Sequence, residues 1–239
     1  MDERHKYDQY LRKRIEKDWS LDPRQYDRQL ILKKFLLDSS NFILDCGCGE
    51  KEPLIVCNTY KAVAFDIGES GLKNLKTNDF KGHVIMGSCT HLPFRNKCFE
   101  KSICSEVIEH LPASEDVRKC ICEIERVSRA FMVTTPNNQF DFKWLEQTHK
   151  RFFNTKNICK FLPENTIVTT SNVSQSKAQF MPILPYFLLD KGKTFIGKWL
   201  CALNYHVVRT PMGKIIKRIK APLHGMAFIV AVYHSCASN

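Results

Sequence analysis

The sequence predicts an α/β fold in which helices cover both faces of a mostly parallel sheet. Short apolar runs of strand length recur from residue 42 onward, and segments with helical or loop character separate them. Strands that alternate with helices form βαβ units, which place parallel strands side by side. The chain of 239 residues is long enough for one such domain with additional segments.

The expected elements follow one another along the chain with few interruptions. Strands are expected at 42–46, 61–66, 82–87, 100–105, 130–135, 166–173 and 225–235. Helices are expected at 114–129, which has acids in its first turn, and at 155–164. Residues 1–40 predict a helical segment of two helices separated near Pro23, followed by a domain of residues 41–239.

Positive charge is concentrated in the C-terminal part. Residues 141–239 hold 14 Lys or Arg and 4 Asp or Glu, a net charge of +10, whereas the whole chain carries +11. This part contains an expected cap insertion at about 174–222, where large apolar residues alternate with Lys and Arg. Three interpretations remain open: a helix at a membrane surface, a basic lid that binds RNA, and a cap whose apolar face belongs to the core.

The composition indicates a cytoplasmic protein, either in solution or peripheral to a membrane. The N-terminus is charged where a signal peptide would be apolar, and no apolar run approaches the roughly 18–20 residues of a membrane span. The 11 cysteines are scattered and several lie in apolar runs, which favours reduced thiols. No C-x2-C pair is present, so the sequence gives little support for a thiolate zinc site.

A glycine-containing turn follows the first expected strand. Asp45, Gly47 and Gly49 lie in "LDCGCGE", where the backbone can approach a ligand closely. Asp66 ends the second expected strand about twenty residues later, where a carboxylate can accept both hydroxyls of a ribose. Glu52 stands where the dinucleotide pattern G-x-G-x-x-G requires its last glycine, which argues against a nicotinamide or flavin cofactor.

The segment "SEVIEHL" follows the fourth expected strand. On a helix that begins at its first residue, Glu106, Glu109 and His110 would share one face at the edge where α/β sheets bind ligands. Two carboxylates and an imidazole suit Mg²⁺ or Mn²⁺, and His149 in "QTHKRFF" is a candidate fourth ligand. Two alternatives stay open: a metal-free site, and a structural role for these side chains.

Each alternative gives the same side chains a different role. With a metal, the ion would hold vicinal hydroxyls and lower the pKa of the attacking one. Without a metal, His110 or His149 is the natural general base near neutral pH. In a structural role, Glu106 would contact the cofactor, Glu109 would face solvent and His110 would hydrogen-bond a loop. The catalytic candidates are therefore His110, His149 and Glu106.

Four segments, in order, resemble the motifs of class I S-adenosylmethionine-dependent methyltransferases of the type 11 group. They are "ILDCGCGE", "VAFDIGESGLKNLK", "GSCTHLPFRNKCFEKSICSEVIEHL" and "FMVTTPN", and the resemblance covers about residues 40–170. It implies a Rossmann-like sheet of seven strands with a reversed last hairpin, and S-adenosylmethionine as the methyl donor. The residues implied at the cofactor are Asp45, Gly47 and Gly49 for its methionine part, Asp66 for its ribose, Ser88 and Cys89 beside its adenine, and Ser105.

The pattern E-x-x-E-H resembles two groups within this family. With a distal histidine it is similar to the metal site of small-RNA 3′-terminal 2′-O-methyltransferases, and it also occurs in quinone-biosynthesis O-methyltransferases. The first expectation is methyl transfer to an oxygen of a small-molecule or lipid-like acceptor. The alternatives are metal-dependent 2′-O-methylation of RNA and a non-catalytic cofactor-binding protein. An anionic partner, a membrane surface or RNA, is expected at the basic C-terminal part.

Overall fold

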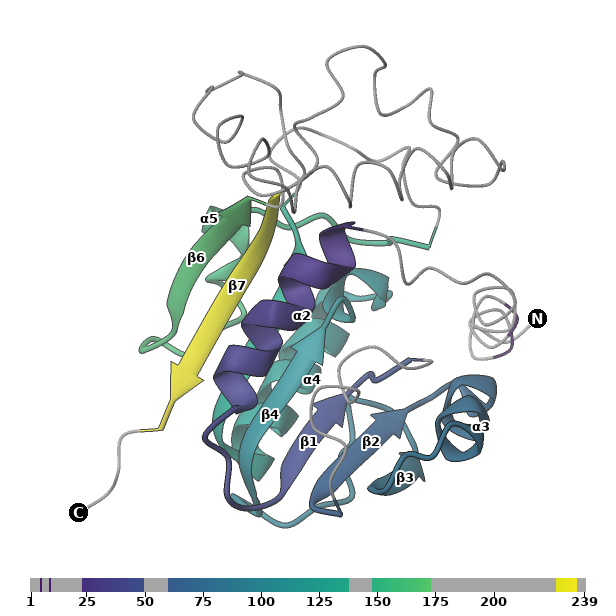
Figure 1. Ribbon diagram of the computed structural model, residues 1–239. Helices are drawn as coiled ribbons and strands as arrows, with labels where there is room; N and C mark the ends of the chain where they lie inside the picture. Colours follow the sequence, from purple (N-terminus) through teal and green to yellow (C-terminus); the bar gives the residue numbers. More distant parts are fainter. Residues whose placement is uncertain are drawn as a thin grey trace, which may run out of the picture.

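Seven strands form one sheet in the order β3-β2-β1-β4-β5-β7-β6 (Figure 1). The computed structural model describes residues 5, 9, 23–49, 60–137, 148–172 and 227–235. Its strands are β1 Ile43–Cys46, β2 Ala62–Asp66, β3 His83–Met86, β4 Phe99–Ser105, β5 Ser128–Pro136, β6 Ile167–Asn172 and β7 Ala227–His234. Strands β1 to β5 pair in parallel, whereas β7 is antiparallel to β5 and β6. The expected Rossmann-like sheet with a reversed last hairpin is confirmed.

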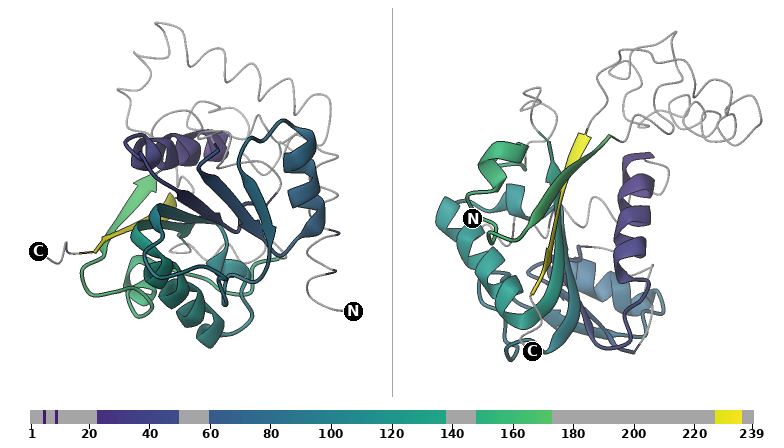
Figure 2. Two further views of the ribbon diagram at one scale, coloured as in Figure 1. Left: turned by 90° about the horizontal axis from the view of Figure 1, so that it is seen from below. Right: turned by 90° about the vertical axis from the view of Figure 1, so that its left-hand side faces the viewer.

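Helices cover both faces of the sheet (Figure 2). On one face lie α2 (Pro23–Leu36) and α3 (Glu69–Thr77), whose buried leucines pack on alanines of β2. On the other face lie α4 (Ser114–Val127) and α5 (Thr155–Ile158). Because both faces are covered, β1 and β2 are buried along their whole length, which explains why all their residues except Asp45 and Asp66 are apolar.

The sequence of α4 shows how one helix is fixed on the sheet. Its buried residues recur at helical spacing: Val117, Cys120, Ile121, Ile124 and Val127. At its start, the side chain of Asp116 accepts a hydrogen bond from the backbone N–H of Ala113 at 3.1 Å. The helix therefore presents an apolar stripe to the sheet and begins at a defined residue.

Two helix predictions differ from the structure. The expected helix over 155–164 is limited to Thr155–Ile158, and Pro163 prevents a regular continuation. The expected α-helix at "SEVIEHL" is absent, because β4 ends at Ser105 and a single 3₁₀ turn, Ile108–His110, follows. Leu111 is extended with φ −71° and ψ 133°, as a residue before proline prefers, so an α-helix cannot continue through it.

The described residues include only part of the predicted N-terminal helical segment and none of the predicted cap insertion. The predicted separation near Pro23 corresponds to the first residue of α2, a position that proline favours in helices. The preceding helix and the cap insertion at about 174–222 lie outside the described residues. Within the described ranges, no helix has both the length and the apolar character that crossing a membrane requires.

Candidate active site at the carboxyl edge of the sheet

The first turn is attached firmly to the neighbouring strand. The backbone N–H groups of Gly47 and Cys48 donate to the carbonyl oxygen of Phe65 at 2.7 and 3.2 Å. Gly47 and Gly49 have φ values of 84° and 59°, a conformation that favours glycine. A Cβ atom at position 47 would also overlap the side chain of Val107, which follows β4. The glycine therefore lets this turn approach the loop that carries the Glu–Glu–His motif.

Asp66 orients its carboxylate through two backbone amides. The N–H of Gly49 donates to Oδ2 at 2.8 Å and the N–H of Gly68 donates to Oδ1 at 2.7 Å. The residue is only 3% exposed at the end of β2. A carboxylate oxygen can accept more than one hydrogen bond, so these two amides orient the group without excluding a ribose hydroxyl by their number alone. The arrangement fits the role that the sequence predicts for this acid.

The other predicted cofactor residues lie at the same edge or just inside it. Asp45 is fully buried in β1. Ser88 and Cys89 follow β3, where the hydroxyl of Ser88 lies 2.9 Å from that of Thr90. Ser105 ends β4 and its hydroxyl pairs with that of Thr134 at 2.9 Å. The ends of β1 to β4 thus carry every residue that the sequence assigns to the cofactor.

Glu109, His110 and His149 form a compact cluster at this edge. One carboxylate oxygen and one nitrogen from each imidazole lie within 4.8 Å of one another. The two rings are 5.0 Å apart with an interplanar angle of 73°. Glu109 is 1% exposed, and its Oε2 accepts from the hydroxyl of Thr135 at 2.9 Å. Within the described part of the chain, its Oε1 has no hydrogen-bond partner.

Backbone hydrogen bonds bring His149 to the 3₁₀ turn. The N–H groups of Lys150 and Arg151 donate to the carbonyl oxygen of Glu109 at 2.8 and 3.0 Å. The Nδ1 atom of His110 lies 3.1 Å from the carbonyl oxygen of Thr148. A carbonyl can only accept, so Nδ1 of His110 carries the proton, and Nε2 of the neutral ring retains its lone pair. Both nitrogen ligands are therefore positioned by the same loop contact.

Glu106 lies outside the three-residue cluster. Its φ of 57° is left-handed, a conformation that costs a non-glycine residue about 1–2 kcal/mol. Its Oε1 accepts from the hydroxyl of Thr134 at 3.4 Å, and its Oε2 lies 3.4 Å from Nη1 of Arg28 on α2. The sequence predicted Glu106 beside the other three side chains, whereas the structure places its carboxylate with Arg28.

The carboxyl group of Glu109 has a pKa well above its ordinary value. Burial is the largest cause, and the negative charge of Glu106 acts in the same direction. A backbone hydrogen bond, the hydroxyl of Thr135 and the charge of Arg28 lower the pKa of Glu109, but they do not cancel burial. A positive charge at the cluster, in addition to that of Arg28, would therefore stabilise the ionised form of the Glu109 carboxyl group.

Sequence reasoning did not single out Arg28, Thr134, Thr135 or Arg151. Thr134 and Thr135 carried a usable signal, because both end a predicted strand at the edge where ligands bind. Arg28 carried none, since its approach depends on how α2 packs against the sheet. Arg151 donates from Nη1 to the hydroxyl of Ser114 and from Nη2 to the carbonyl of Pro112, at 2.8 and 2.9 Å.

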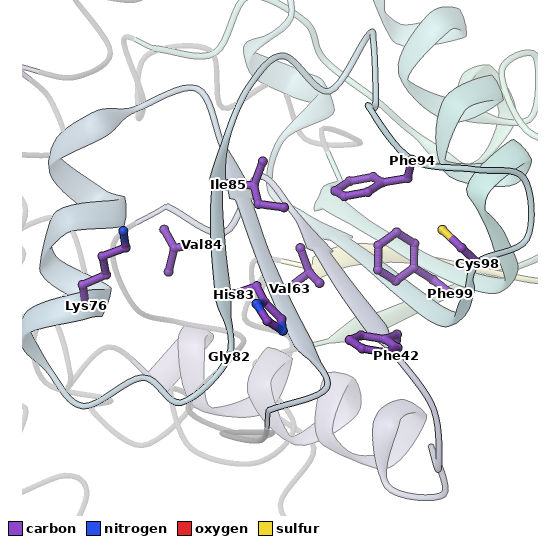
Figure 3. A pocket seen from close by; sticks show the side chains of 10 residues that line it. All are labelled: Phe42, Val63, Lys76, Gly82, His83, Val84, Ile85, Phe94, Cys98 and Phe99. Atoms are coloured by element: carbon purple, nitrogen blue, oxygen red, sulfur yellow. The ribbon is translucent and has the colours of Figure 1, made fainter.

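A cavity of about 580 Å³ lies at the opposite end of the sheet (Figure 3). Residues that precede or begin β1, β3 and β4 contribute to its wall, among them Phe42, His83 and Phe99. Figure 3 shows aromatic side chains on one side of β3 and Lys76 on the other. None of the candidate site residues lines this cavity.

Residues 44–130 match the family model described as a methyltransferase domain. The match covers about a third of the chain and indicates a methyltransferase domain in that part. Two uncharacterized proteins of Methanocaldococcus jannaschii, MJ0638 and MJ1252, are 32% and 30% identical to it over 98 and 122 residues. These matches cover 41% and 50% of the chain, and 40% and 45% of the two relatives, so this chain spans less than half the length of either protein.

Solved structures share the methyltransferase fold at low sequence identity. The [4+2]-cyclase SpnF has a TM-score of 0.58 and 13% identity, with 87% of this chain and 80% of that chain covered. A SAM-dependent methyltransferase from Archaeoglobus fulgidus has a TM-score of 0.57 and 15% identity, with 88% of this chain and 94% of that chain covered. The small RNA methyltransferase HEN1 has a TM-score of 0.56 and 16% identity, with 89% of this chain and 25% of that chain covered. At these identities the likeness shows the class I fold alone, and the fold also occurs in a cyclase.

Proposed function

We propose that the protein transfers a methyl group from S-adenosylmethionine to a hydroxyl oxygen, with a divalent cation held by Glu109, His110 and His149. One observation carries the proposal: these side chains form a cluster at the same sheet edge as the glycine turn and Asp66. A methyl donor and an acceptor hydroxyl would therefore meet between the two groups of residues. The proposal combines the expected methyl transfer with the metal-assisted alternative.

The residues at the turn fit the proposed donor. The Asp66 carboxylate is oriented by two backbone amides at the end of β2, where the two ribose hydroxyls of the donor would lie. Gly47 and Gly49 keep the adjoining backbone free of side chains, and Ser88 and Cys89 would lie beside the adenine. When bound, S-adenosylmethionine supplies an electrophilic methyl group on its sulfonium.

The cluster also fits a borderline divalent cation such as Mn²⁺. Its donors are one carboxylate oxygen and two imidazole nitrogens, and the buried Oε1 of Glu109 has no partner among the described residues. Thr135 fixes the other oxygen of Glu109, while the carbonyl of Thr148 fixes the tautomer of His110. When bound, the cation would act as a Lewis acid on the acceptor hydroxyl. A metal-free site would instead leave His110 or His149 to accept the hydroxyl proton.

Two acceptor classes fit the proposed chemistry. A small or lipid-like molecule with neighbouring hydroxyls is the first candidate, since vicinal oxygens suit a cation site with open positions. The terminal ribose of RNA is the second. Two observations favour it: the net charge of +10 in residues 141–239, 14 basic against 4 acidic, and the shared fold with the small RNA methyltransferase HEN1.

Transfer of radiolabelled methyl from S-adenosylmethionine tests the proposal. The acceptors are a catechol, a catechol-bearing lipid in neutral vesicles, and RNA ending in either a ribose or a 2′-deoxyribose. We expect Mn²⁺-dependent labelling that is abolished by EDTA, and by Glu109→Gln and His149→Ala. His83→Ala serves as the control, because His83 is exposed at the opposite end of the sheet. Labelling of ribose-ended RNA alone would select the second acceptor class.

Two outcomes would contradict parts of the proposal. Full activity in EDTA would remove the cation and leave a histidine as general base. Absence of S-adenosylhomocysteine binding at millimolar concentration, measured by isothermal titration calorimetry, would overturn methyl transfer itself. Binding without transfer to any acceptor would favour a non-catalytic cofactor-binding protein.

A further inference from the structure

Arg28 brings a positive charge from α2 to the carboxyl edge of the sheet. Its Nη1 lies 3.4 Å from Oε2 of Glu106, and the two side chains are 13% and 24% exposed. An ion pair with this burial is screened less by water than an exposed one. The pair therefore acts on the electrostatics of the neighbouring cluster and not only on the surface of the helix.

Glu106 is held toward Arg28 by more than the ion pair. Its backbone N–H donates to the carbonyl of Thr134 at 2.9 Å, and its Oε1 accepts from the hydroxyl of the same threonine at 3.4 Å. Its left-handed backbone turns the side chain out of the regular path of the strand. Thr134 and Arg28 thus each contact one oxygen of the Glu106 carboxylate beside the cluster.

Arg28 also lies near Glu109. The hydroxyl of Thr134 donates to Glu106 and the hydroxyl of the next residue, Thr135, donates to Glu109, so the ion pair and the cluster meet at the end of β5. In agreement with this placement, the guanidinium lowers the pKa of Glu109 and the carboxylate of Glu106 raises it. Arg28 therefore compensates negative charge on both glutamates, which is also what a divalent cation at Glu109, His110 and His149 would do. Two cations that stabilise the same acids repel each other and weaken each other's binding.

We propose that Arg28 is a counter-ion that competes with the divalent cation and so sets the affinity of the cluster for it. This inference rests on the proposed function, because it takes the cluster to be a cation site. Arg28 is a positioning residue in this scheme and makes no contact with reacting atoms. It weakens cation binding, and Glu106 strengthens it.

A double-mutant cycle on Arg28 and Glu106, in which the affinity for Mn²⁺ is measured, tests the inference independently of activity. The free Mn²⁺ concentration is followed by electron paramagnetic resonance during titration of the protein. We expect Arg28→Met to tighten Mn²⁺ binding about five- to tenfold, and Glu106→Gln to weaken it by a similar factor. The double variant should bind Mn²⁺ close to wild-type affinity, because both members of the pair are neutral.

Two further variants separate a local effect from general ones. Arg129→Met removes the same charge at the amino end of β5, far from the cluster, and should leave Mn²⁺ affinity within twofold of wild type. Arg28→Lys keeps the charge and should retain wild-type affinity even if the guanidinium supports folding. Circular dichroism confirms that each variant is folded before titration.

The outcomes distinguish this inference from the proposed function. If the wild type binds Mn²⁺ and Arg28→Met binds it equally or more weakly, the counter-ion role is overturned and the cation site stands. If the wild type does not bind Mn²⁺ at millimolar concentration, the cation site fails and the counter-ion role fails with it. Tightening in Arg28→Met together with weakening in Glu106→Gln supports both.

Discussion

The carboxyl edge of the sheet has two sides, one at β1 and β2 and one at β4 and β5, and the buried acids on these sides differ in their hydrogen-bond partners. At the β1–β2 side, both oxygens of Asp66 accept backbone amides, from Gly49 and Gly68. At the β4–β5 side, Glu109 accepts from Thr135 through one oxygen, while the other has no hydrogen-bond partner among the described residues. Both acids are at most 3% exposed, so burial does not distinguish them.

The difference predicts that Asp66 belongs to the framework and that Glu109 depends on a ligand. A buried carboxylate with two amide partners is satisfied within the fold and stabilises the turn that it orients. A buried carboxylate with a neighbouring carboxylate and an unused oxygen costs stability unless a cation accompanies it. Substitutions on the two sides should therefore change stability in opposite directions.

Gly47→Val should have the largest effect, because it separates the two sides where they meet. The new side chain would overlap Val107 and would require a β-branched residue at φ 84°. We expect a loss of about 4 kcal/mol in the free energy of unfolding and no detectable binding of S-adenosylhomocysteine. Urea denaturation and calorimetry measure the two effects.

Val107→Ala in the same chain provides the control. It removes the two closest contacts, those with the Cγ atoms of Val107, but leaves the strained backbone at position 47, so it should restore only part of the stability. Full recovery would show that the glycine is required for space alone. No recovery would show that the contact between the two loops is unimportant.

Asp66→Asn tests the β1–β2 side, where both carboxylate oxygens accept hydrogen bonds. An asparagine amide directs an NH₂ group at a backbone N–H, so one of the two present hydrogen bonds is replaced by repulsion. We expect a loss of about 3 kcal/mol in the free energy of unfolding and at least tenfold weaker binding of S-adenosylhomocysteine. Unchanged stability with weaker binding would mean that the acid serves the ligand and not the turn.

Glu109→Gln should act in the opposite direction on stability. The folded pKa of Glu109 lies well above its unfolded value of 4.5, so its contribution is complete below that value and is lost as pH rises through the folded pKa. With a chelator present, the variant should gain about 1–2 kcal/mol at pH 8 and nothing at pH 4. Urea denaturation at both pH values measures this, with exposed Glu164→Gln as control. A destabilised variant at pH 8 would place Glu109 in the framework with Asp66.

Glu123→Gln should have the smallest effect and lies outside both sides. Glu123 accepts from Arg126 at 2.7 and 2.8 Å and from the N–H of Leu92 at 2.7 Å, and the bonds from Arg126 are the main cause of its lowered pKa. Its contribution is therefore present above the unfolded pKa of 4.5 and is lost as pH falls through the folded pKa. The variant should lose about 1 kcal/mol at pH 7 and less at pH 3, with exposed Glu115→Gln unchanged.

The strands were predictable from sequence because a parallel sheet covered on both faces consists of nearly continuous apolar runs. The run 42–46 became Ile43–Cys46, and 130–135 became Ser128–Pro136. The grouping of Glu109 and His110 with His149 also agrees with the sequence, since strand ends of a parallel sheet share one edge.

The local geometry of the site was less predictable, for two physical reasons. The spacing of "SEVIEHL" suggested an α-helix, but Pro112 keeps Leu111 extended and leaves room for one 3₁₀ turn only. The spacing therefore gave the correct neighbours for Glu109, while the carboxylate of Glu106 lies beside the cluster and pairs with Arg28. Arg28 could not be predicted, because the sequence of a helix does not state which strand end it reaches.

The carbonyl oxygen of Glu109 makes the assembly of the site directly observable. It accepts the amide protons of Lys150 and Arg151, so those two amides are protected only while the loop that carries His149 is docked. Their hydrogen exchange therefore reports the opening free energy of this loop, separately from global unfolding. Two amide resonances would show whether a cation closes a loop that is open part of the time or meets one that is already closed.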